Sequence, residues 1–114
     1  MVNDYIPAKN NIIYINLDPR LGKELAKRRP CLVLSGKELN RRLGRVVICP
    51  ISSVSPKIGT HIPLPKNQKA SGTIIVDQIK SLDWRARKAE KVDFLGSQEI
   101  FEMVIERLNT MFEE

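Results

Sequence analysis

The stretch that decides the fold is IIYINLDPRLGKELAKRRPCLVLS, residues 12–35. Its two ends, residues 12–17 and 31–35, are short apolar runs rich in branched side chains, and turn residues bound them. Such runs predict β-strands. The charged residues 18–29 between them predict a long loop, and a loop of about twelve residues without structure of its own usually carries function.

The middle of the chain continues this pattern of short strands and turns. Residues 45–52 contain a third strand, in which Pro50 indicates an edge position or a bulge near the strand end. Residues 36–44 fit one or two helical turns that stop at Gly44. Further runs predict an edge strand at 61–64, a polar turn at 65–72, a strand at 73–76, and its continuation or pairing partner at 78–82.

The C-terminal segment changes to a helical period, with Ser97 as a suitable N-cap and Glu99 in the first turn. Its apolar residues recur at spacings of three and four, which is typical of an amphipathic helix. They are Ile100, Phe101, Val104, Ile105, Leu108, Met111 and Phe112. The connections between strands are too short for crossover helices. The sequence therefore predicts one mainly β domain, residues 1–114: a small, strongly bent antiparallel barrel with a packed C-terminal helix.

The charge of the chain is unevenly distributed. The net charge is +6, but residues 98–114 carry −4, which leaves +10 on the rest. A basic body favours an anionic partner. RNA or DNA fits better than a membrane surface, because no basic amphipathic helix stands out and no apolar run approaches the roughly 18 residues that span a bilayer. Five basic residues surround Glu24 in the first loop: Arg20, Lys23, Lys27, Arg28 and Arg29.

The cysteines predict neither a disulfide nor a metal site. Cys31 and Cys49 each lie inside an apolar run, form no CxxC pair and are accompanied by a single histidine, His61. Two buried, reduced thiols are the better interpretation, with no metal and no cofactor. The first ten residues contain no apolar run of the kind found in secretory signals. Together these features favour a cytoplasmic location.

Three blocks of the sequence resemble the MazF/PemK family of toxin endoribonucleases. They are residues 12–35, then VVICPISS (46–53), then DQIKSLDWRAR (77–87), in the family order and spacing. The resemblance implies an SH3-like barrel of the CcdB/MazF type and a homodimer. It further implies metal-independent, sequence-specific cleavage of single-stranded RNA (mRNA) within a type II toxin–antitoxin system. The cognate antitoxin would place an acidic tail in the RNA groove.

The resemblance also implies roles for particular residues. The catalytic arginine of the family matches Arg29, which precedes Pro30, and its loop glutamate matches Glu24. The catalytic hydroxyl falls on Ser52, where relatives usually carry threonine. The remaining groove residues predicted to contact RNA are Arg20, Lys23, Lys27, Arg28, Ser53, Lys57, His61, Gln78 and Lys80.

These residue types suit RNA cleavage by the neighbouring 2′-OH, which leaves a 2′,3′-cyclic phosphate and a 5′-OH. Glu24 would accept the 2′-OH proton. Arg29 would stabilise the charge that develops on phosphorus-bound oxygens, because a guanidinium presents a planar fork of donors. Ser52 would donate a hydrogen bond to the scissile phosphate.

Several alternatives remain open at this level. Glu24 and Arg29 can form an ordinary surface ion pair, and His61 can be structural or line the groove. Trp84 can stack on a base, but packing in the barrel or an interface is the favoured interpretation. The whole chain can also be a gyrase-inhibiting toxin on the same fold, or a basic RNA-binding barrel without catalysis.

Overall fold

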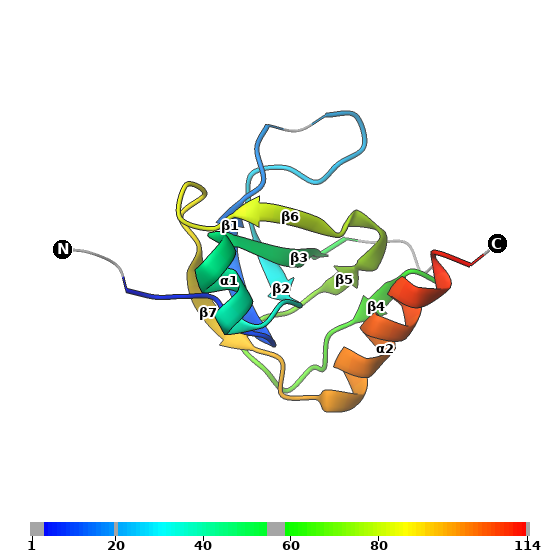
Figure 1. Cartoon of the computed structure of the whole chain (residues 1–114). Helices are drawn as coiled ribbons and strands as arrows, with labels where there is room; N and C mark the ends of the chain where they lie inside the picture. Colours follow the sequence, from blue (N-terminus) through cyan, green and yellow to red (C-terminus); the bar gives the residue numbers. More distant parts are fainter. Residues whose placement is uncertain (1–3, 20, 55–58, 114) are drawn as a thin grey trace.

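The computed structural model describes residues 4–19, 21–54 and 59–113, which form one bent sheet with a helix at each of two places along the chain (Figure 1). The chain ends with the longer helix, which packs beside the sheet. The elements in chain order are β1 (Asn11–Asn16), β2 (Arg28–Val33), α1 (Lys37–Leu43), β3 (Arg45–Ser52), β4 (His61–Pro63), β5 (Thr73–Ile75), the 3₁₀ turn η1 (Val76–Gln78), β6 (Lys80–Asp83), β7 (Glu90–Phe94) and α2 (Gln98–Thr110).

All the strand pairs are antiparallel, and the central strand is β3. The sheet runs in the order β4-β5-β3-β2-β1-β7, while β6 pairs with the first half of β3 beside β5. The mainly antiparallel architecture with a C-terminal helix confirms the predicted fold class. Within the described residues, however, no pairing joins β4 to β7, so the strongly bent sheet stays open at its ends.

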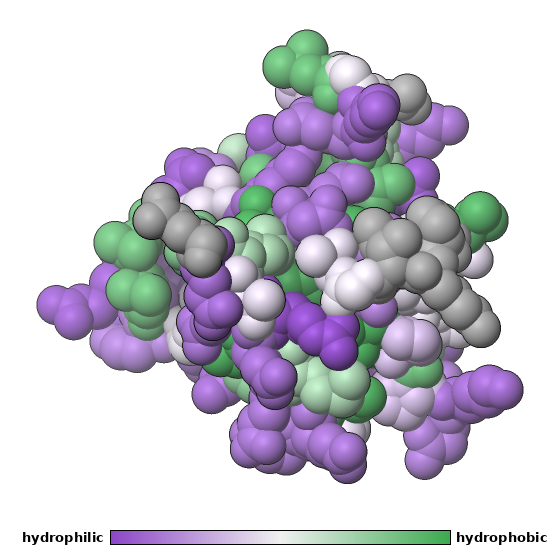
Figure 2. Space-filling view, turned by 90° about the vertical axis from the view of Figure 1, so that its right-hand side faces the viewer, coloured by the Kyte–Doolittle hydropathy of each residue, from purple (hydrophilic) through white to green (hydrophobic). Residues whose placement is uncertain are grey.

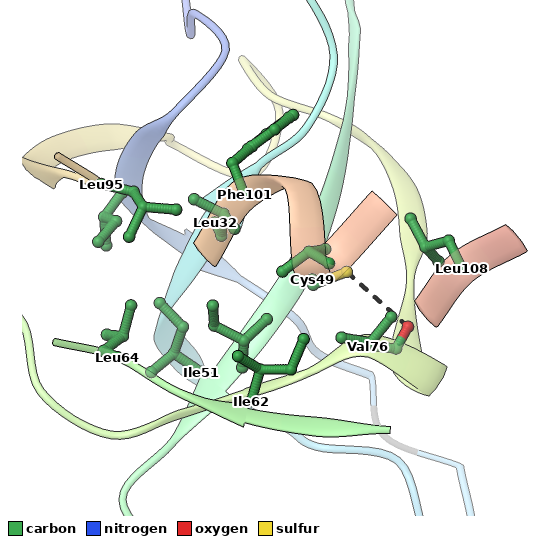
Figure 3. Close-up of a cluster of buried hydrophobic side chains, with 12 residues drawn as sticks. Leu32, Cys49, Ile51, Ile62, Leu64, Val76, Leu95, Phe101 and Leu108 are labelled. Carbon is green, nitrogen blue, oxygen red and sulfur yellow. Dashed lines mark hydrogen bonds between the residues drawn. The ribbon is translucent and has the colours of Figure 1, made fainter. Parts of the chain in front are cut away.

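Each face of the sheet carries a hydrophobic cluster, because side chains of one strand alternate between the two faces. Ile12 and Leu32 pair across β1 and β2 and belong to the cluster beneath α2, whereas Ile13 and Cys31 pair one position along and belong to the opposite cluster. In β1, Ile12, Ile13 and Ile15 are buried, whereas Tyr14 and Asn16 are exposed. Figure 3 shows the first cluster, in which sheet residues meet side chains of α2.

The predicted C-terminal helix is confirmed, including its start. The Ser97 hydroxyl accepts a hydrogen bond from the backbone N–H of Ile100 at 3.1 Å, which caps α2. Phe101, Val104 and Leu108 are buried against the sheet. The rest of the predicted apolar stripe is more exposed, namely Ile100, Ile105, Met111 and Phe112.

Helix α1 is fixed by a polar side chain that reaches into the interior. Asn40 is 1% exposed; its amide donates to the carbonyl of Pro7 at 2.8 Å, and its side-chain oxygen accepts from the Ser35 hydroxyl. The indole N–H of Trp84 donates to the backbone carbonyl of Asn40 at 2.9 Å. Trp84 is thus a buried packing residue, as favoured from the sequence. Gly44 ends α1 in the left-handed conformation, as predicted.

Some sequence expectations were wrong in detail. Strand β2 begins at Arg28 rather than at residue 31, because residues 28–30 continue the pairing with β1. Strand β7 was not predicted; it is a charged strand with only one paired side, and such edge strands carry few apolar residues.

Pro50 is not on an edge strand. It lies in β3 between the residues that pair with β6 and those that pair with β5, where the strand changes partner and needs no ladder hydrogen bond. The strand predicted over 78–82 begins only at Lys80, since η1 turns the chain between β5 and β6.

Candidate active site

The loop between β1 and β2 is closed at its base by backbone hydrogen bonds. The N–H of Leu17 donates to the carbonyl of Lys27 at 2.8 Å, and the N–H of Lys27 donates to the Asp18 carboxylate at 2.9 Å. Lys27 adopts a left-handed conformation with φ +66° to do so. From the other side, the Arg87 guanidinium donates to the carbonyl of Asp18 at 2.7 Å. These hydrogen bonds hold the two ends of the long loop together where it leaves the sheet, and we call this closed base the neck of the loop.

Farther along, three successive loop residues are held by three different partners. Lys80 on β6 lies 3.8 Å from the Glu24 carboxylate, measured from Nζ to Oε1. The Gln78 side-chain oxygen accepts the backbone N–H of Leu25 at 2.9 Å. Arg29 donates from Nε to the carbonyl of Ala26 at 2.8 Å. Four predicted site residues, Glu24, Arg29, Gln78 and Lys80, are thus gathered where the loop folds back over the sheet.

Arg29 and Ser52 belong to neighbouring strands. The pairing of β2 with β3 ends where Cys31 lies opposite Pro50, so Arg29 and Ser52 each lie two residues beyond the last paired position. Burial raises the pKa of the Cys31 thiol, and the charges of Lys80 and Arg29 partly oppose the rise, which places both cations near this thiol. The thiols of Cys31 and Cys49 are free and buried, as predicted.

The Ser52 hydroxyl is already engaged within its own turn. The side chain is 5% exposed; its oxygen donates to the carbonyl of Val54 at 2.6 Å and accepts from the Val54 N–H at 3.2 Å. Gly72 packs directly against this backbone, because a Cβ atom built on it would lie 2.7 Å from the Ser52 carbonyl oxygen. The turn at Ser52 therefore depends on a glycine that the sequence argument missed.

The predicted RNA-binding cations are divided between the two faces of the sheet. Arg28 precedes Arg29 in an extended strand, so its side chain lies on the opposite face. There its guanidinium lies 6.0 Å from the centroid of the Tyr14 ring and 3.8 Å from the Glu90 carboxylate. Lys27 lines a hollow beside Arg28. The basic cluster of the first loop therefore does not act as one patch.

The other predicted site residues lie near the loop after β3 or on the loop surface. His61 Nε2 lies 3.4 Å from the Asp77 carboxylate, which also accepts a hydrogen bond from Thr60 at 3.0 Å. Lys23 and Ser53 are exposed. Arg20 and Lys57 lie outside the described residues. Viewed from the side of α2, hydrophilic residues cover most of the surface, and the first loop projects above it (Figure 2).

Among residues 4–19, 21–54 and 59–113, no group of three or more His, Cys, Asp or Glu side chains is arranged to hold a metal ion. In the same part of the chain, no helix is long and apolar enough to cross a membrane.

The fold recurs in known proteins. The chain is 31% identical over 111 residues to the endoribonuclease toxin MazF of Escherichia coli K12, which covers 97% of this chain and 98% of that protein. It superposes on the crystal structure of MazF from Deinococcus radiodurans with a TM-score of 0.90 and 31% identity, covering 95% and 97% of the two chains. A MazE–MazF complex from D. radiodurans matches with a TM-score of 0.82 and 29% identity, covering 95% and 96%.

A family model described as the PemK-like, MazF-like toxin of type II toxin–antitoxin systems matches residues 8–112, nearly the whole chain. A match of this extent, together with 31% identity to a MazF over almost the full length of both proteins, leaves one assignment. The chain belongs to the PemK/MazF-like family of toxins of type II toxin–antitoxin systems.

Proposed function

We propose that this chain is a sequence-specific endoribonuclease toxin that cleaves single-stranded RNA, including mRNA, without a metal ion. The observation that carries the proposal is the anchored position of Arg29, whose Nε donates to the carbonyl of Ala26, two residues after Glu24 in the same loop. A guanidinium held in this way keeps its terminal nitrogens for the oxygens of a phosphate. The names of the MazF relatives agree with this activity.

The proposed reaction uses the substrate's own 2′-OH as the nucleophile. Glu24 accepts the 2′-OH proton, the oxygen forms a bond to phosphorus, and the bond to the 5′-oxygen breaks. The leaving 5′-oxygen takes up a proton from water, so the products are a 2′,3′-cyclic phosphate and a 5′-OH. Arg29 stabilises the negative charge that develops on the phosphate oxygens, an effect worth about 3 kcal/mol by comparison with a lost oxyanion donor. Lys80, whose Nζ lies 3.8 Å from the Glu24 carboxylate, helps to hold this carboxylate in place.

Ser52 has two possible contributions in this reaction. Its hydroxyl can donate to the scissile phosphate once its contact with the Val54 carbonyl opens, or it can act from its turn by shaping the loop after β3. In the first case Ser52→Ala and Ser52→Thr differ sharply in cleavage rate, because only threonine keeps the donor. In the second case both variants lower the melting temperature as well.

The proposed partners follow from the family. We expect a homodimer and a cognate antitoxin whose acidic tail competes with RNA, since MazE–MazF complexes are known for structurally similar toxins. A basic body and an acidic segment from residue 98 onward are consistent with an anionic ligand. We expect the toxin to act in the cytoplasm, on single-stranded RNA.

The decisive experiment is cleavage of a long RNA in EDTA, with the fragment ends mapped. We expect cuts at one short sequence and 2′,3′-cyclic phosphate ends from the wild type. Arg29→Ala should cut at least about 100-fold more slowly, because the developing charge loses its main donor. Arg42→Ala is the matched control, since it removes the same charge from an exposed position on α1.

Other outcomes would support the alternatives. Arg29→Ala with full activity would remove the proposed mechanism. Inhibition of DNA supercoiling without RNA cleavage would indicate a gyrase-inhibiting toxin. RNA binding that depends strongly on salt, without cleavage, would indicate a non-catalytic RNA-binding domain.

A further inference from the structure

The face of the sheet opposite Arg29 carries a basic groove that the proposed reaction does not use. A hollow of about 510 Å³ lies between β1, β2 and β7, with Tyr14, Lys69 and Lys91 among its lining residues. Pro30 is part of its lining, and the Tyr14 side chain is 39% exposed. This hollow is therefore lined by one aromatic residue and two lysines.

Two further hollows adjoin the first. One of about 330 Å³ is lined by Lys27, Arg28 and Lys88, and Arg28 reaches from it over the Tyr14 ring. The other, of about 500 Å³, shares Lys69 with the first and includes Phe94, which is 56% exposed. We call the three together the Tyr14 groove. Its lining comes mainly from β1, β2, β7 and the segment 65–71.

The carboxylates in and beside the groove are already engaged. Glu90 lies 3.8 Å from the Arg28 guanidinium. Asp93 accepts hydrogen bonds from the N–H of Ala70 at 2.8 Å and from the Gln68 amide at 3.2 Å. Asp18 accepts the N–H of Lys27. The groove therefore presents an excess of positive charge, supplied by Lys27, Arg28, Lys69, Lys88 and Lys91.

We propose that the Tyr14 groove is a second binding site for single-stranded RNA, separate from the cleavage site. Cations along a groove with exposed aromatic rings are the pattern by which proteins hold single strands, since phosphates meet the cations and bases stack on the rings. Here a base stacks on the Tyr14–Arg28 pair, and a neighbouring base meets Phe94, whose ring lies 6.0 Å from the Lys91 ammonium. The identity of the polyanion rests on the proposed function.

An acidic protein segment is the competing occupant, and the aromatic residues argue against it. Ammonium groups alone are enough to bind the carboxylates of an acidic peptide. Two exposed aromatic rings beside cations leave apolar surface in contact with water, and a flat ligand such as a base would cover it. Stacking is also tolerant of sequence, because every base has a flat face. The site therefore adds affinity for RNA of any sequence around the recognised one.

The first test measures binding with an RNA that cannot be cut. A fluorescent 2′-O-methyl oligoribonucleotide is titrated against the wild type, the double variant Lys69→Ala/Lys91→Ala and Tyr14→Ala. We expect the slope of log K against log salt concentration to be smaller by about 1.4 in the double variant, because two phosphate contacts to a single strand are lost. Tyr14→Ala should weaken binding about tenfold. Lys37→Ala/Arg42→Ala removes the same charge from α1 and should change neither value by a comparable amount.

The second test separates this site from the cleavage site. A short RNA that covers only the recognised sequence should be cut by the wild type and by Lys69→Ala/Lys91→Ala with the same kcat and KM. A long RNA should show a raised KM for the double variant alone. If no RNA is cut by any protein, the proposed function fails, while the titration still decides whether the groove binds RNA.

Three results would overturn the proposal. The first is unchanged affinity and salt dependence in both groove variants, with circular dichroism confirming that they are folded. The second is tight, groove-dependent binding of poly-glutamate without binding of the oligoribonucleotide, which would assign the groove to a protein partner. The third is a loss of the dimer in Lys69→Ala/Lys91→Ala, which would assign this face to contact between copies of the chain.

Discussion

At the scale of single residues, the chemistry depends on which side of β2 a side chain lies. Arg28 and Arg29 are adjacent in sequence, yet one meets Tyr14 and Glu90 while the other meets the carbonyl of Ala26. Strand geometry separates them, because successive side chains point to opposite faces. A basic run that looks like one patch in sequence therefore supplies two different surfaces.

Gln78 should matter as a positioning residue for the first loop. Gln78→Leu removes the oxygen that accepts the N–H of Leu25, so the loop loses one of its three anchors. We expect kcat/KM to fall about tenfold, because a tenfold change corresponds to the net free energy of about one hydrogen bond. Hydrogen exchange at the Leu25 amide should become faster.

Gln78→Glu is the matched control for this prediction, because it keeps an acceptor oxygen at the same place. It should retain the slow exchange at Leu25. Equal exchange rates in Gln78→Leu and the wild type would contradict the positioning role.

Gly72 should be intolerant of any side chain. Its φ is +129°, and a Cβ would lie 2.7 Å from the Ser52 carbonyl oxygen and 2.9 Å from the Ile51 side chain. Gly72→Ala should lower the free energy of unfolding by about 2 kcal/mol through strain at this contact. Urea denaturation measures the loss. Gly96→Ala, whose Cβ would meet only the Phe94 ring at 3.8 Å, should be close to neutral.

At the scale of elements, the sequence predicted what depends on local pattern. Residues 12–17 and 45–52 form strands, and the helix after Ser97 begins at the predicted cap, because apolar period and capping chemistry are local properties. Strand β7 was not predicted, because few of its residues are apolar and only its pairing with β1 identifies it as a strand.

The candidate site was predictable in part, for the same reason. The residue types in the loop and in the 77–87 block pointed to Glu24, Gln78 and Lys80, and the structure brings these three together around the loop. The separation of Lys27 and Arg28 from Arg29 was not predictable, because it depends on where β2 begins. The pairing with β1 decides that, not the local sequence.

The anchoring of α1 by Asn40 gives a prediction at this scale. Asn40→Ala leaves the Pro7 carbonyl and the Ser35 hydroxyl without their partner in a buried place. We expect a loss of about 3 kcal/mol in the free energy of unfolding. Leu39→Ala, a neighbouring change at a half-exposed position of the same helix, should cost much less. Similar losses in the two variants would contradict the role given to Asn40.

At the scale of the whole molecule, one sheet separates two hydrophobic clusters, and each contains a buried thiol. Cys49 lies beneath α2 and directs its sulfur toward the carbonyl of Val76 at 3.8 Å (Figure 3), while Cys31 lies in the opposite cluster. Burial raises the pKa of Cys49 to about 12 and raises that of Cys31 as well. Both thiols therefore stay protonated in the folded chain at mildly alkaline pH.

These thiols should make stability fall as the pH rises. In the unfolded chain they ionise near pH 8.5, so above that pH the folded state binds more protons than the unfolded state, and folding is disfavoured. We expect the free energy of unfolding to fall by up to about 1.4 kcal/mol per pH unit for each thiol, measured by urea denaturation between about pH 8 and 10. Cys49→Ala should roughly halve this slope. A stability that does not change over this range would contradict the buried state of the thiols.

The alternation along β2 has a consequence for how this molecule can vary. The loop of residues 18–27 can gain or lose residues at its tip, because its neck is closed independently by Leu17, Lys27 and Asp18. An insertion of one residue between Arg29 and Val33 would instead shift Arg28 and Arg29 by one position along β2, so that each side chain would move to the opposite face of the sheet. The two guanidinium groups would then trade sides, and the molecule would lose its proposed nuclease chemistry while every element of its architecture survived.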